Sequence, residues 1–165
     1  MVRCSLVLMA LLILEGCTPA GFIRSENDSA GFSWEFDEAK AHREENGSIS
    51  VSARGQRRNG LFWSRPHGVE LSFKLSASAS TGRPVSEREV SEFVLQTWGH
   101  VFFARSLLQT GTFRLSQTGP SRAHIEVEAV VASDAHSRDK SDAPERIRIE
   151  LDADLSSSKR TPGPR

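Results

Sequence analysis

Hydrophobic and polar residues alternate along most of this chain. The clearest run covers residues 69–80, where Val, Leu, Phe, Leu, Ala and Ala occupy the odd positions and Glu, Ser, Lys and Ser the even ones. Because successive side chains of a strand point to opposite faces, a period of two predicts half-buried β-strands. The same period recurs in residues 32–37, 49–54, 112–117, 123–131 and 146–155.

One segment has helical spacing instead. Ser86 stands three residues before Glu89, which is the arrangement of a capping box. Behind it, Val90, Phe93, Val94 and Trp98 lie on one face of a helix. The pattern predicts a helix from about Glu87 to Trp98, with a continuation toward Leu108 left open. Residues 37–46 also contain the i, i+4 charge pairs of a surface helix.

The last two strands are expected to form an antiparallel hairpin. With Val127 opposite Ile147, Glu126 would face Arg148 and Glu128 would face Arg146. Opposite charges directly across a strand pair contribute about 0.2–1 kcal/mol each. The expected register is therefore the one that satisfies both faces of the hairpin.

Together these elements predict an α+β fold. About six mostly antiparallel strands would form a sheet or small sandwich with one packed helix. A single β-rich globular domain is expected over residues 32–155, followed by a disordered tail over residues 156–165 that contains two Pro and one Gly.

The first residues have the features of an export signal. A nine-residue apolar run, Leu6 to Leu14, follows Arg3. A membrane-spanning helix needs about 20 apolar residues, so this run fits a secretory signal peptide better than a transmembrane segment.

Leu14-Glu15-Gly16-Cys17 resembles the lipobox of bacterial lipoprotein precursors. Leu14, Gly16 and Cys17 match that pattern, and Glu15 departs from it. The resemblance implies a signal peptide over residues 1–16, a thioether-linked diacylglycerol on Cys17 and an acyl chain (palmitate) on its amine. Thr18 in place of an Asp points to the outer membrane, and residues 17–31 would then be a flexible tether. The alternative is cleavage after Ala20, which gives a free secreted protein.

Charge and cysteine content exclude several classes of protein. Acidic and basic residues balance at 21 each, so no overall charge attracts nucleic acid. Both cysteines, Cys4 and Cys17, lie in the N-terminal segment. The domain that follows can therefore form no internal disulfide and has no thiol nucleophile or thiolate metal site.

Candidate chemistry is sparse in the remaining sequence. Asp134, His136, Asp139 and Asp142 could supply metal ligands, but the basic residues among them favour a solvated loop, and no metal site is predicted. A candidate contact surface comprises Arg57, Arg58, Trp63 and Arg65, at the tip of an expected hairpin. Such a tip could meet an envelope protein or a glycan, or Phe62 and Trp63 could fold inward.

These observations predict a lipid-anchored protein of the bacterial cell envelope that faces the periplasm or the exterior. We expect a binding or scaffolding module with no cofactor beyond the lipid on Cys17. Two alternatives remain open: an enzyme whose site is assembled from distant residues, and a carrier of an apolar ligand.

Overall fold

Strands make up nearly all of the described chain. The computed structural model describes residues 19–26, 33–57, 67–79, 82–98, 103–134 and 144–157. Within these ranges there is no α-helix, and the one helical element is the 3₁₀ turn η1 (Glu87–Glu89). The strands are β1 (Gly21–Ser25), β2 (Ser33–Phe36), β3 (Glu38–Arg43), β4 (Ile49–Arg57), β5 (His67–Leu75), β6 (Pro84–Ser86), β7 (Val90–Trp98), β8 (Phe103–Gly119), β9 (Arg122–Ser133) and β10 (Glu145–Ser157).

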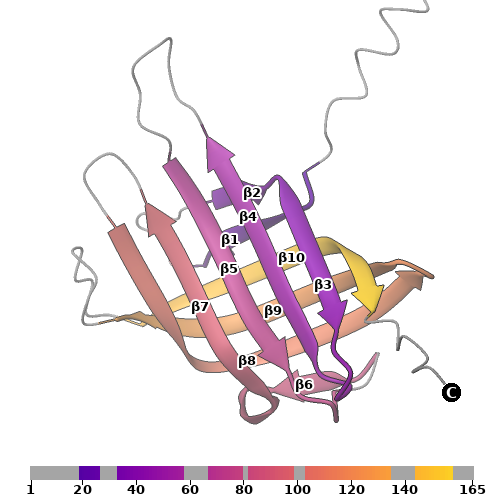
Figure 1. Cartoon of the computed structure of the whole chain (residues 1–165). Helices are drawn as coiled ribbons and strands as arrows, with labels where there is room; N and C mark the ends of the chain where they lie inside the picture. Colours follow the sequence, from indigo (N-terminus) through magenta and orange to yellow (C-terminus); the bar gives the residue numbers. More distant parts are fainter. Residues whose placement is uncertain are drawn as a thin grey trace, which may run out of the picture.

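Seven strands form a closed β-barrel in the order β3-β4-β5-β7-β8-β9-β10. The pairing of β10 with β3 closes the ring. The β10–β3 pair is parallel, and the other pairs in this ring are antiparallel. Figure 1 shows β3, β4, β5 and β7 as one wall, with β8, β9 and β10 crossing behind it. The expected α+β fold with a packed helix is therefore wrong.

The N-terminal strands complete the wall between β10 and β4. One edge of β10 pairs first with β1, through residues 147–151, and then with β3, through residues 154–157. Strand β2 pairs with β1, and after it the backbone N–H of Asp37 donates to the carbonyl of Arg54 at 2.9 Å. Strand β1 lies inside the segment expected to be a tether, so the ordered barrel begins before Phe32.

A close approach of β2 to β4 requires a glycine. A Cβ placed on Gly55 would lie 2.0 Å from the carbonyl oxygen of Glu35. The side chain of Asp37 also accepts a hydrogen bond from the backbone N–H of Gln56 at 2.8 Å. Gly55 therefore allows the N-terminal strands to close over β4.

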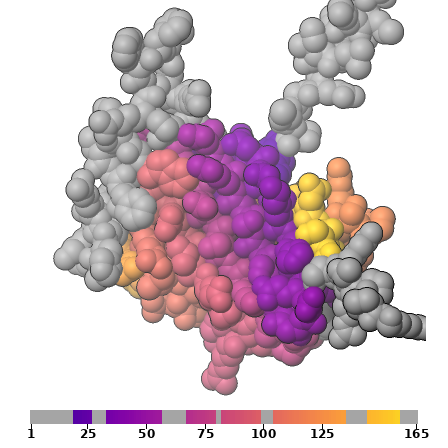
Figure 2. All heavy atoms as spheres, viewed as in Figure 1, coloured from indigo at the N-terminus to yellow at the C-terminus, as the bar shows by residue number. Residues whose placement is uncertain are grey.

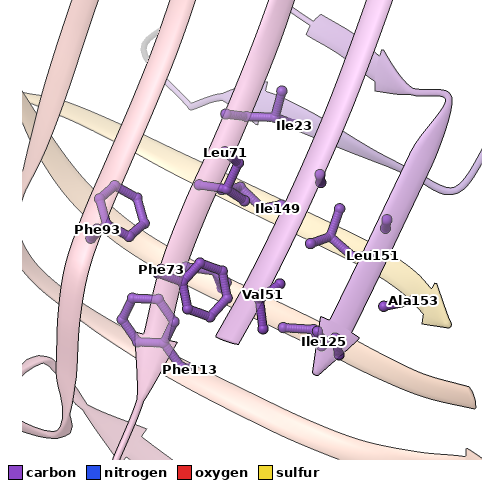
Figure 3. Close-up of a cluster of buried hydrophobic side chains, with 14 of the residues drawn as sticks. Ile23, Val51, Leu71, Phe73, Phe93, Phe113, Ile125, Ile149, Leu151 and Ala153 are labelled. Atoms are coloured by element: carbon purple, nitrogen blue, oxygen red, sulfur yellow. The ribbon is translucent and has the colours of Figure 1, made fainter. Parts of the chain in front are cut away.

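The barrel interior is filled with hydrocarbon side chains. The alternating residues of each strand that point inward are buried, as the sequence pattern predicts. At the centre, the ring of Phe73 lies 5.2 Å from that of Phe113 and 6.1 Å from that of Phe93, centroid to centroid. Figure 3 shows these rings beside aliphatic side chains of the core: Val51 on β4, next to Phe73, and Ile125, Ile149 and Leu151 on β9 and β10 of the wall behind.

The segment predicted as a helix is strand β7. Its register against β5 shifts between Ser72 and Lys74, because Ser72 pairs with Val94 and Lys74 with Ser91. This shift is a β-bulge, and Glu92 within it has a φ of 57°. A bulge adds one residue to a strand, so Val90 and Phe93, three apart, both face the barrel interior. The bulge thus produces the Val90–Phe93 part of the spacing that suggested a helix, while Val94 of the same pattern points outward.

The predicted helix start is reduced to one 3₁₀ turn. Ser86 makes no side-chain capping bond, and the chain returns to an extended conformation at Val90. The carboxylate of Glu89 instead accepts hydrogen bonds from the hydroxyl of Ser78 and the guanidinium of Arg83. The helical spacing in residues 37–46 is likewise overridden, since most of that segment is strand β3.

Strands β9 and β10 form the predicted antiparallel hairpin with a different register. Val127 pairs with Ile149 rather than Ile147, a shift of two residues. Glu128 then faces Arg148, and Glu126 faces Glu150. An even shift keeps every side chain on its expected face, so burial alone does not distinguish the two registers. Strand β8 on the other edge supplies a cation for Glu126, because Arg114 Nη1 lies 3.2 Å from its Oε2.

Candidate binding groove

Outward-pointing side chains of the barrel wall form three rows that cross the strands. The central one, which we call the serine row, pairs residues of β10, β3, β4, β5 and β7: Asp154, Lys40, Ser52, Ser72 and Val94. On one side runs the turn-side row, Ser156, His42, Ser50 and Lys74. On the other side runs the arginine row, Glu38, Arg54, Glu70, Gln96 and Arg105.

A groove of about 1040 Å³ follows the serine row. Its lining contains the whole serine row and the whole turn-side row, together with Glu92, Arg105 and Ser121 and the apolar residues Val51, Phe73 and Leu155. Short side chains at Ser52 and Ser72 leave the middle low, while longer charged side chains stand on both sides. Figure 2 is viewed from the side of this wall of the barrel. We call this feature the outer groove.

The turn between β3 and β4 fixes one wall of the outer groove. Gly47 has a φ of 86°, a conformation that favours glycine, and the backbone N–H of Ser48 donates to Asn46 Oδ1 at 2.9 Å. This turn places the carboxylate of Glu44 beside three donors. Lys74 Nζ donates to it at 2.6 Å, Ser50 Oγ at 2.5 Å and Ser48 Oγ at 3.0 Å.

These contacts set the charge of both members of the Glu44–Lys74 pair. The hydrogen bond from Lys74, followed by those from Ser50 and Ser48, lowers the pKa of Glu44 to about 2. The same bond to Glu44 raises the pKa of Lys74, and the charge of Glu92 adds to that shift. Lys74 therefore stays protonated at neutral pH and cannot act as an amine nucleophile.

Polar contacts also occur at both ends of the groove, with Lys40 and His42 at the β10–β3 end and Arg105 at the β8 end. The ammonium group of Lys40 binds the carboxylate of Glu38, which raises the pKa of Lys40 and lowers that of Glu38. His42 Nδ1 lies 2.9 Å from Ser156 Oγ. Arg105 Nε lies 3.7 Å from Asp134 Oδ2, and this buried nitrogen has no hydrogen-bond partner among the described atoms. Cationic and anionic groups thus occur along the whole groove.

A second polar constellation lies on the outer face of β8, β9 and β10. His124 Nδ1 is 2.9 Å from Asp152 Oδ1, and Ser116 pairs with His124 in the neighbouring strand. These residue types are those of a Ser-His-Asp triad, but the other ring nitrogen of His124 lies 3.7 Å from Glu126 Oε1. The arrangement fits a cross-strand polar cluster better than an activated serine.

Most of the site residues predicted from the sequence lie outside the residues that the structure describes. Arg57 is the last residue of β4, and Arg58, Trp63 and Arg65 lie outside the described residues, as does Cys17. Neither the contact surface nor the lipid attachment site is therefore placed. The outer groove was missed by sequence reasoning because its rows are created by pairing between strands. The serines at alternate positions of β4 and β5 were its one visible signal.

Within the described ranges, no three His, Cys, Asp or Glu residues are grouped so that they could hold a metal ion. The same ranges contain no helix with the length and apolar character needed to cross a membrane.

The fold and the groove define the class of this protein: a closed seven-stranded β-barrel with a filled interior and, on its outer wall, a groove lined by charged, hydroxyl and apolar residues. Comparisons with protein families, curated proteins and solved structures give no match for this chain.

Proposed function

We propose that this chain is a lipid-anchored protein of the bacterial cell envelope whose barrel is a non-catalytic binding module. The observation that carries the binding role is the outer groove, a volume of about 1040 Å³ on the outside of the barrel. Small-molecule and cofactor sites in proteins are concave and occupy about 300–1,000 Å³. The volume of the groove lies just above that range, and its course across five strands suits an elongated ligand.

The packing of the interior favours this role over that of an apolar carrier. A carrier needs a void among apolar side chains, and the centre of this barrel holds three phenylalanine rings in mutual contact. Phe113 is fully buried, and Phe73 and Phe93 are 2% and 6% exposed. A ligand could enter the barrel interior beside these rings only if the rings left their packed positions.

The groove also favours binding over catalysis. Catalytic groups need a pKa close to the working pH. The shifts at the groove move Glu44 to about 2 and raise the pKa of Lys74 and Lys40, so each group is held in its charged form. Charged groups with fixed protonation suit recognition through hydrogen bonds.

The lipid anchor rests on the N-terminal sequence. With Cys17 acylated, three residues would separate it from Gly21, the first residue of β1, so the two lie four residue steps apart. Four residues span at most about 14 Å. The barrel would then sit close to the membrane surface, on a shorter tether than the sequence suggests.

Two experiments test the proposal separately. Mass spectrometry of the mature N-terminus should find Cys17 carrying diacylglycerol and an acyl chain, and Cys17→Ser should release the protein from membranes. A mature protein that begins elsewhere, or without acyl mass, contradicts the anchor.

A photoreactive residue placed at position 72 in living cells tests the binding role. We expect it to yield crosslinked products that the same residue at Ser33, on the outer face of β2, does not yield. Equal products from both positions contradict a binding role for the groove.

A further inference from the structure

We propose that the outer groove binds an uncharged, hydroxyl-rich chain, that is, a segment of neutral oligosaccharide lying across the strands. This inference rests on the proposed binding function and names its ligand. It is carried by the shape of the groove, the balance of its charges and the pairing of the strands beneath it.

The shape of the groove suits a linear ligand. The serine row crosses five strands, from Asp154 in β10 to Val94 in β7, and Arg105 of β8 lies beyond it. Neighbouring strands are about 4.8 Å apart, so the row is about 19 Å long and the groove about 24 Å. Ser52 and Ser72 are exposed at its centre, where a ligand can lie against the sheet.

The charges along the groove are balanced. Lys40, Lys74 and Arg105 line it together with Glu92 and Asp154. The two lysines also bind Glu38 and Glu44, which cancels much of their field. A polyanion would meet carboxylates and a polycation would meet ammonium groups along the same path, and each such contact is unfavourable.

A hydroxyl group matches this mixture because it both donates and accepts hydrogen bonds. Lysine and arginine only donate, carboxylates only accept, and serine hydroxyls do both. A ligand whose polar groups are hydroxyls can satisfy each of these in turn. A wholly apolar ligand would instead remove water from charged groups such as Glu92 and Arg105 without supplying hydrogen bonds in return.

The pairing of the strands disfavours an extended peptide. Peptides that bind as added strands need a free sheet edge with unpaired N–H and C=O groups. Strands β4 and β5, which form the floor, are each paired on both edges. The outer groove therefore offers side chains rather than backbone groups.

Local strain occurs at the wall of the groove. Glu92 has a φ of 57°, a conformation uncommon for residues other than glycine, and its side chain lines the groove beside Lys74. Such strained backbone conformations concentrate at functional sites. Here the bulge places the carboxylate of Glu92, a hydrogen-bond acceptor, in the same groove as the hydroxyl groups of Ser52 and Ser72.

Isothermal titration calorimetry of the full acylated protein tests the inference. The protein is kept in an amine-oxide detergent, which has no sugar headgroup. The probes are three uncharged hexasaccharides: a β-1,4-glucan, an α-1,4-glucan and a β-1,4-linked N-acetylglucosamine chain. A polysulfated polysaccharide is the anionic probe.

We expect at least one neutral hexasaccharide to bind. Its Kd should change less than about twofold between 0.1 and 1 M salt, although the Debye length falls from about 10 Å to about 3 Å. The double variant Ser52→Gln/Ser72→Gln fills the floor and should raise the Kd at least about tenfold by steric exclusion. The control Ser33→Gln makes the same change outside the groove and should leave the Kd unchanged.

Three results would overturn the inference. One is the absence of binding by all three neutral probes at about millimolar concentration, which corresponds to about −4 kcal/mol. Another is binding that the double variant and the control affect equally. The third is preferential, salt-sensitive binding of the polysulfated probe that the double variant abolishes, which would leave the proposed binding function standing with a different ligand.

Discussion

The interior of the barrel and its outer groove are built by the same strands, but they differ in packing, charge and exposure to solvent. Residue 73 of β5 points inward and is a buried phenylalanine, while its neighbours Ser72 and Lys74 point outward into the groove. The interior is apolar and closely packed. The outer groove carries charged side chains of both signs and hydroxyl groups beside apolar surface, and it is open to solvent.

This difference separates stability from recognition. Burial of apolar area dominates the folding free energy, so inward substitutions should change the stability of the barrel. Surface substitutions away from special features change stability by about 0.5 kcal/mol or less, so substitutions of the exposed serines Ser52 and Ser72 should act on binding alone. The following predictions test that separation, from the largest expected effect on stability to the smallest.

Phe113→Ala should have the largest effect. Phe113 is fully buried and its ring contacts both Phe73 and Phe93, so its removal leaves a cavity at the centre of the barrel. We expect the free energy of unfolding, measured by chemical denaturation, to fall by about 3–5 kcal/mol. Phe22→Ala is the matched control. Phe22 is half-buried beneath the guanidinium of Arg24, and its removal should cost far less. Equal losses would contradict the separation.

Gly55→Ala should have an intermediate effect. The new Cβ would overlap the carbonyl oxygen of Glu35, so β2 must move away from β4. We expect a loss of about 1–3 kcal/mol in the free energy of unfolding. Gly119→Ala has no atom within 4 Å of the new Cβ and should change stability by less than about 0.5 kcal/mol. If Gly55→Ala left the free energy of unfolding unchanged, the N-terminal strands would not pack against β4 as described.

Glu44→Gln should change how stability depends on pH. The pKa of Glu44 is about 2 in the folded barrel, against an ordinary value of 4.5. A lowered folded pKa stabilises the folded state above pH 4.5, and this contribution is lost as the pH falls from 4.5 toward 2. The unfolding midpoint of Glu44→Gln should therefore fall less steeply with acid over that interval. Glu45→Gln alters the neighbouring carboxylate of the same turn. An identical acid profile in both variants would contradict the assigned hydrogen bonds.

Ser72→Gln should have the smallest effect on stability. Its side chain is exposed on the outer face and can extend into the groove without entering the interior. The unfolding free energy should stay within about 0.5 kcal/mol of the original value. A loss comparable to that of Phe113→Ala would show that the groove supports the fold.

The same contrast explains how much of the structure could be predicted from the sequence. Alternation identified the inward residues of β4, β5, β9 and β10, because burial imposes a period of two on each strand. It misassigned β7, where the bulge at Glu92 interrupts that period. It also misplaced the β9–β10 register, since β8 supplies a partner for Glu126 that a two-strand argument omits.

The outer groove could not be predicted in the same way. Lys40, Ser52 and Ser72 are far apart in the sequence, and the strand registers bring them into one row. Barrel closure depends on the parallel pair of β10 and β3, which joins the first and last strands of the seven-stranded ring. No local pattern encodes that pairing, and without it Asp154 and Ser156 do not reach the groove.

The central claim is that ligands bind outside a filled barrel. An amide NMR titration of the full protein with the hexasaccharide that binds most tightly tests it most directly. The account predicts shifts that concentrate at Lys40, Ser52, Ser72 and Lys74, while the amide signals of Ile125, Val127 and Ile149 on the opposite wall stay in place. Shifts that concentrate at those interior residues of β9 and β10 would contradict it.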